Sequence, residues 1–111
     1  MASNFDSLSG LIYEVKRPVE ERTFLVDFSK VIATGKTIES VDDVASSTVG
    51  LVEGSQAMTV VAGSITGLKV AFKASGGTDE EDYEVTILLT DSDGDVVSDD
   101  VMVKVRKAGK V

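Results

Sequence analysis

Apolar and polar residues alternate along much of the chain, a period of two that is typical of β-strands with one buried face. The four clearest runs are residues 23–28, 68–74, 83–90 and 101–106. No helical periodicity competes with them. Their inward-facing members form the expected core: Phe24, Val26, Phe28, Val70, Phe72, Tyr83, Val85, Ile87, Val101 and Val103.

Less regular stretches between these runs predict further strands. The expected additional strands are residues 11–15, 37–41, 48–52 and 58–62. Pro18 ends the first of them, because proline cannot donate to a β-ladder. Gly63-Ser64 is expected to be the turn after the last, and Asp93-Gly94 predicts a tight turn within a terminal hairpin.

About seven strands spaced roughly ten residues apart, with no helices between them, predict an all-β fold. We expect an immunoglobulin-like antiparallel β-sandwich over residues 11–106, preceded by a flexible arm over residues 1–10 and followed by a frayed tail over residues 107–111. Immunoglobulin-like domains often hold a strand-starting tyrosine by hydrogen bonds from its hydroxyl to upstream backbone. Tyr83 stands at such a place; otherwise it is a half-buried strand former.

Length and composition bound the class of protein. The 111 residues suit one domain, and 42% hydrophobic with 27% charged residues is the balance of a folded globular protein. There is no cysteine, so packing alone must hold the core. A net charge of −8 repels nucleic acids and anionic membranes, so the expected partners are proteins or cations. The first residues lack a basic region and a long apolar run, which predicts a soluble protein made in the cytoplasm.

The chain offers few groups for chemistry. It has neither histidine nor cysteine, which removes the commonest nucleophile–base pairs and the usual zinc ligands. No spacing singles out a pair of carboxylates for acid–base catalysis. We therefore expect no catalytic residues, no cofactor and no enzymatic activity.

The remaining metal candidates are Asp91, Asp93 and Asp95, which alternate across the hairpin turn as calcium ligands do. A full calcium loop spreads its ligands over about twelve residues and ends on a bidentate glutamate. This segment does not continue in that way, and aspartate and glycine are also the residues that a tight turn requires. The turn is the favoured interpretation. The acidic run of residues 79–82 is likewise expected to be a solvated loop, with a partner-facing patch as the alternative.

Two parts of the chain carry longer motifs. The first part reads Pro18-Val19-Glu20-Glu21, then Phe24-Leu25-Val26-Asp27-Phe28-Ser29, then Gly35-Lys36-Thr37-Ile38-Glu39-Ser40. The second reads Val70-Ala71-Phe72-Lys73-Ala74-Ser75-Gly76-Gly77-Thr78, then Tyr83-Glu84-Val85-Thr86 and Ser92-Asp93-Gly94. Together they resemble the fibre-tail adaptors, a family of small virion proteins of tailed bacteriophages. The resemblance covers residues 18–106; it departs at Phe28, where the family often has tryptophan, in the longer segment before Pro18, and over residues 41–64.

The resemblance implies an immunoglobulin-like fold and a structural role in the tail, fibre or head–tail region of a phage or prophage particle. It implies no catalytic residues, and it implies other virion proteins, including further copies of the chain, as partners. The alternative class is a binding module of a bacterial surface or secreted protein, rigidified by calcium and cut from a longer chain. Neighbouring genes separate the two: terminase, portal and tail genes favour the virion protein, and a longer reading frame with a signal peptide favours the module.

Residues 1–10 generate the first prediction. Phe5 and Leu8 are isolated apolar side chains in a polar segment, which suits anchors that bind a partner by adding a strand to its sheet edge. The alternative is that the segment packs on its own sandwich. We expect a chain that begins at Leu11 to keep its fold and to lose assembly. Strong protection of the amides around Phe5 against hydrogen exchange in a monomer would contradict the arm.

Overall fold

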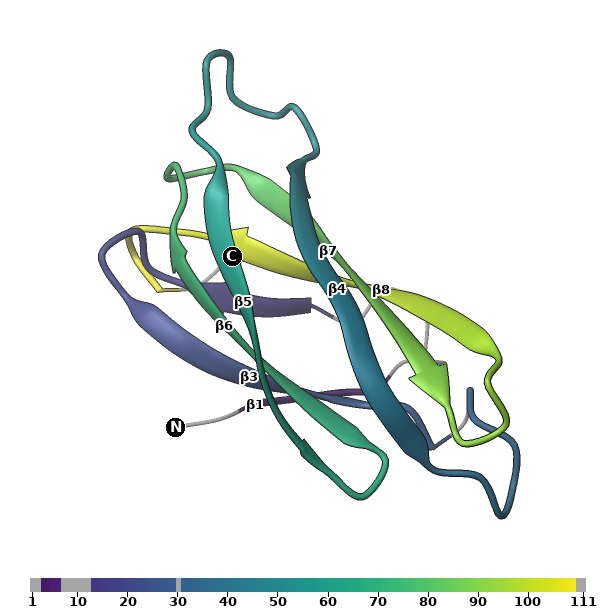
Figure 1. The fold of residues 1–111 in the computed structure, drawn as a ribbon. Coiled ribbons are helices and arrows are strands. Elements are labelled where there is room, and N and C mark those ends of the chain that lie inside the picture. The colour runs from purple at the N-terminus through teal and green to yellow at the C-terminus, as the bar shows by residue number, and fades with distance from the viewer. Residues whose placement is uncertain (1–2, 7–12, 30, 110–111) are drawn as a thin grey trace.

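The protein is a two-layer β-sandwich, as expected from the alternating pattern. The computed structural model describes residues 3–6, 13–29 and 31–109, and its elements are shown in Figure 1. The described residues form eight strands: β1 (Ser3–Asp6), β2 (Tyr13–Lys16), β3 (Glu21–Asp27), β4 (Ile38–Thr48), β5 (Met58–Thr66), β6 (Lys69–Gly76), β7 (Asp82–Asp91) and β8 (Val96–Val105). The described residues contain no helix that could span a membrane.

Each layer is a four-stranded sheet. One has the order β1-β3-β6-β5 and the other the order β2-β8-β7-β4. The inner pairs are antiparallel, whereas β1 runs parallel to β3 and β2 runs parallel to β8 at the sheet edges. The turn at Pro18 carries the chain from one sheet to the other, so β2 and β3 do not pair as a hairpin.

The core lies between the two sheets. All ten residues expected there are buried, which confirms the assignment of faces in the four strongest runs. Phe24 and Phe72 face each other across β3 and β6, with ring centroids 5.5 Å apart. Leu89, Val105 and Met58 complete the same cluster.

β4 differs from the expectation. The predicted strand over residues 48–52 is wrong: β4 is one strand that ends at Thr48, and the chain then enters a loop. Register shifts between Ile38 and Ser40, and again between Val41 and Asp43, break the alternation of inward and outward side chains along this strand. The alternation of apolar and polar residues therefore does not predict this strand beyond its middle.

The turn predicted at Gly63-Ser64 is also wrong. These residues lie inside β5, where the register shifts between Ala62 and Ile65, and the chain reverses only at Gly67, whose φ is +59°. A β-bulge and a turn both use glycine, so the sequence alone does not separate them. A Cβ on Gly63 would lie 3.2 Å from the Cβ of Ala71, so the bulge packs closely on β6.

The N-terminal segment pairs with its own sheet where it is described. The backbone of Ser3–Asp6 lies beside Phe24–Asp27, with Phe5 opposite Val26, which corresponds to the alternative considered for the arm. Leu8 lies outside the described residues, and the mobility of residues 1–10 in solution stays a prediction. At the other end, the Lys107 amide donates to Asp79 (2.6 Å), and residues 110–111 of the expected tail are outside the described part.

Phe72→Ala tests the core. Because Phe72 is fully buried against Phe24, its truncation should lower the free energy of unfolding by about 3–5 kcal/mol. Val19→Ala is the control, since Val19 is 94% exposed and its truncation should change stability little. Urea denaturation of both variants measures the difference. An unchanged midpoint for Phe72→Ala would contradict the placement of β6 in the core.

Candidate functional site

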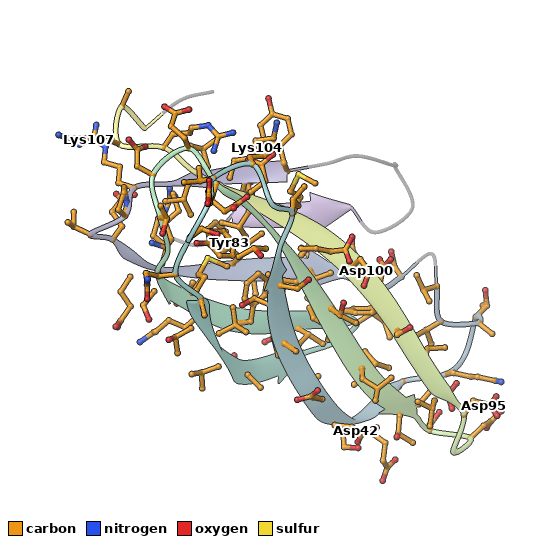
Figure 2. All side chains as sticks on the ribbon, turned by 90° about the horizontal axis from the view of Figure 1, so that it is seen from above. Asp42, Tyr83, Asp95, Asp100, Lys104 and Lys107 are labelled. Atoms are coloured by element: carbon orange, nitrogen blue, oxygen red, sulfur yellow. The ribbon has the colours of Figure 1, made fainter. Side chains whose placement is uncertain are left out.

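Buried charges gather at one end of the sandwich, around the connection from β6 to β7. Lys16, Glu81, Asp82 and Arg106 are all buried there, although charged side chains are usually exposed. Figure 2 shows Lys104 and Lys107 toward this end of the molecule, whereas Asp42 and Asp95 lie at the opposite end. The expectation of a solvated loop at residues 79–82 is therefore wrong for Glu81 and Asp82.

The Glu81 carboxylate binds the backbone of the loop between β4 and β5. Oε1 accepts hydrogen bonds from the amides of Gly50 (3.2 Å), Leu51 (3.0 Å) and Asp82 (2.9 Å). Oε2 accepts from the amide of Val52 (3.3 Å). Four backbone donors thus converge on one carboxylate, and three of them belong to a loop distant in sequence.

The surroundings of Glu81 favour its ionised form. Burial raises the pKa of this carboxyl, but hydrogen bonds from the Ser55 side chain and from the amides of Leu51, Asp82 and Val52 outweigh burial and lower the pKa to about 2. The side chain therefore stays charged at neutral pH.

Tyr83 fixes the far side of the same loop. Its hydroxyl accepts a hydrogen bond from the Thr78 amide (2.8 Å) and donates one to the Gln56 carbonyl. The Gln56 amide in turn donates to the Thr78 hydroxyl (2.8 Å). The predicted bond from the Tyr83 hydroxyl to upstream backbone is confirmed, and the same hydroxyl also reaches the β4–β5 loop.

The loop of residues 49–57, here called the apolar loop, is held at both ends and projects beyond the two sheets, as the teal segment between β4 and β5 in Figure 1 shows. Its first half presents Val49 and Leu51, which are 49% and 59% exposed. Glu53 is its single charged residue. The apolar loop thus combines exposed apolar side chains with a backbone that is held by hydrogen bonds.

Two cations close the sandwich behind this loop. Arg106 forms a buried ion pair with Asp82 (2.7 Å) and donates to the Glu81 carbonyl (3.0 Å). Lys16 donates from its ammonium group to the carbonyls of Arg17 (2.7 Å) and Gly76 (2.6 Å). Since Gly76 ends β6 and Lys16 ends β2, this contact ties one sheet to the other.

Burial lowers the pKa of Lys16; the charge of Glu20 acts against burial, and the smaller effect of Arg22 lowers the pKa further. The charged groups of this end are thus used in contacts within the chain.

The calcium candidates lie at the opposite end, on the β7–β8 hairpin. Asp91 is buried, and its Oδ1 accepts from the amides of Asp93 (2.9 Å) and Asp95 (3.0 Å), as expected of a turn-forming aspartate. The Lys36 ammonium lies 2.7 Å from Asp93 and 3.7 Å from Asp95. A hydrogen bond and the charge of Asp93 raise the pKa of Lys36, with smaller contributions from Asp91 and Asp95.

The structure brings the three aspartates together around the turn, and Lys36 supplies the positive charge beside two of them. Within the described ranges, no three Asp, Glu, His or Cys side chains are grouped so that they could hold a metal ion. The other two candidate site residues are Phe5 and Leu8. Only the backbone of Phe5 is described, and Leu8 lies outside the described residues.

Sequence reasoning missed Glu81, Lys16 and Arg106 as structural groups. Glu81 stands in a run of acids that resembles any solvated turn, and its ligands are backbone amides, which leave no mark on the sequence. One available signal was Tyr83, because the hydroxyl of a corner tyrosine needs partners in the upstream backbone.

The pH dependence of stability tests the role of Glu81. Its folded-state pKa lies below the ordinary value of 4.5, so the carboxylate contributes stability that is complete above about pH 4.5 and is lost as the pH falls toward 2. Glu81→Gln should lower the melting temperature at pH 7, flatten its decrease between pH 4.5 and 2, and speed hydrogen exchange at Leu51. Glu53→Gln, an exposed change in the same loop, should do none of these. Equal pH profiles for wild type and Glu81→Gln would refute the assignment.

The comparisons with known proteins agree with the resemblance in the sequence. A family model described as "Podophage GP4 fiber-tail adaptor protein gp77" matches residues 16–104, which run from the last residue of β2 into β8 and include the apolar loop, Glu81 and Tyr83. No curated protein and no solved structure gives a significant match. Since the family model covers most of the chain, this protein belongs to the podophage fibre-tail adaptor family and is a phage structural protein.

Proposed function

We propose that the chain is a non-enzymatic adaptor in the tail region of a phage or prophage particle, and that it binds neighbouring virion proteins through the apolar loop. Membership of the adaptor family supports the tail location. The observation that carries the proposal is that a buried carboxylate, Glu81, holds an exposed apolar loop in one shape.

The frame makes the loop suitable for binding. A loop that is ordered before it meets its partner loses less conformational entropy on association. Val49 and Leu51 then supply apolar area, which is removed from water when a partner covers it. The complementary partner surface is an apolar depression with a basic rim, because Glu53 is the single charge of the loop.

Other parts of the proposal follow from the charge and from the N-terminal segment. A net charge of −8 disfavours nucleic acids and anionic lipids as partners. Phe5 and Leu8 are proposed as further partner-binding side chains. The partners are other virion proteins, and further copies of this chain are included among them.

The calcium-rigidified surface module is the less supported alternative. Lys36 lies against Asp93 and Asp95, so a calcium ion at the hairpin would have to displace an ammonium group that already neutralises them. The absence of histidine and cysteine from the chain supports the non-enzymatic character of the proposal.

Leu51→Asp tests the apolar loop in the particle. Leu51 is 59% exposed, so the variant should fold, but a carboxylate at this position should oppose burial against a partner. We expect particles assembled with this variant to contain several-fold less of the adaptor, as measured by quantitative mass spectrometry of purified particles.

Val96→Asp is the matched control. Val96 is 61% exposed and starts β8, next to the hairpin at the end of the sandwich away from the apolar loop. This variant should be incorporated at the wild-type level. Normal incorporation of Leu51→Asp would refute the loop as the contact surface, and absence of the wild-type chain from purified particles would refute the adaptor role itself.

A further inference from the structure

We propose that two copies of the chain pair edge to edge through β5, antiparallel about a two-fold axis, and so join their β1-β3-β6-β5 sheets into one continuous sheet. The proposal concerns a different surface from the apolar loop and does not depend on the adaptor role. It rests on a comparison of the edge strands of the sandwich.

Sheet edges in soluble proteins usually carry features that prevent pairing with other chains, such as charges, prolines or short strands. β4 carries three acids, Glu39, Asp42 and Asp43. β2 has four residues, two of them charged, and Pro18 follows it. β1 also has four residues and ends on Asp6.

β5 has none of these charges. It is nine residues long, and the chain carries no charged residue anywhere from Ser55 to Leu68, although 27% of all its residues are charged. Every residue from Val61 to Thr66 is exposed, with Val61 at 57% and Ile65 at 38%. An edge that is exposed, apolar and uncharged is a template for strand addition.

Among the described residues, β4 of the other sheet contacts the start of this edge. The Ser46 hydroxyl of β4 donates to the Met58 carbonyl (2.6 Å), where the two sheets meet at their corner. Toward Thr66 the strand becomes exposed on both faces, since Ala62 and Ser64 are exposed as well as Val61. The part available for pairing is therefore the second half of β5, after Val60.

A second copy is the occupant that the charges favour. Each chain carries −8, so two copies repel wherever acidic edges approach each other. An antiparallel β5–β5 pair brings no like charges into contact, because neither strand has any. The nearest charges on the neighbouring strand are the cations Lys69 and Lys73, one strand away from the axis. A two-fold contact needs a self-complementary surface, and an uncharged strand facing its own antiparallel copy fulfils this condition.

The bulge limits how far the pairing extends. Gly63 and Ser64 interrupt the ladder with β6, so a straight added strand can follow one side of the bulge at a time. Beside the bulge lies a cavity of about 350 Å³, whose lining includes Val61, Gly63, Ser64 and Lys73. This hollow gives room for an outward-facing apolar side chain of the added strand.

Sedimentation of the full chain from about 1 μM to about 1 mM tests the proposal. We expect a reversible monomer–dimer equilibrium. Val61→Lys should raise the dimer dissociation constant by about tenfold or more, because it places two like charges beside the axis. Val96→Lys, at an exposed valine of similar exposure, should leave the constant unchanged. Melting temperatures check that both variants fold.

Hydrogen exchange locates the contact. The amides of residues 61–66 should exchange more slowly as the protein concentration passes through the dimerisation range. A chain that stays monomeric to about 1 mM overturns the proposal, as does equal weakening by both lysine variants. Protection confined to β1, β4 or the apolar loop would also overturn it, because the copies would then meet at another surface.

Discussion

The contact between the Glu81 carboxylate and the backbone of the β4–β5 loop is the interaction on which one end of the molecule depends. A carboxylate that is buried away from water needs several hydrogen bonds. The backbone amides of an irregular loop need acceptors that no neighbouring strand supplies. Each group satisfies the other, so neither the burial of Glu81 nor the shape of the loop can exist alone. The corner around Tyr83 and Gln56 extends the same frame.

The middle and the end of the sandwich are stabilised by different kinds of contact. In the middle, the two sheets meet through aromatic and branched aliphatic side chains, and the contact needs no polar groups. At the end, where strands leave the sheets, Lys16 donates to the Gly76 carbonyl, and Arg106 donates to the carbonyls of Glu81 and Val105, which also accept backbone amides. Charged side chains therefore add to the backbone hydrogen bonds where the strands end.

The regular part of this structure could be predicted from the sequence, and the irregular part could not. Phe24, Val70 and Ile87 lie where the alternation placed them, and the motifs around Pro18 and Tyr83 led to the family that the comparison confirms. The bulges in β4 and at Gly63 made the prediction wrong there, because one extra residue in a strand moves every later side chain to the opposite face of the sheet.

The candidate site was harder still to predict, for a related reason. Glu81 is bound by main-chain groups, and Lys36 reaches Asp93 from a segment far away in the sequence. Such contacts depend on tertiary placement, and neither residue type nor local spacing encodes it. The sequence predicts a strand over residues 48–52, in the first part of the apolar loop, because Val49 and Leu51 suit a strand equally well.

The parallel pairing of β2 with β8 gives the chain a particular order of folding. Antiparallel hairpins such as β5–β6 and β7–β8 join neighbours and can form as soon as both strands exist. β2 instead can pair only after β8 is present, and the hydrogen bond by which Lys16 joins the two sheets also forms only then. During synthesis on the ribosome β2 must therefore remain without its final partner until β8 has emerged, which makes closure of this edge a late event in the folding of the domain.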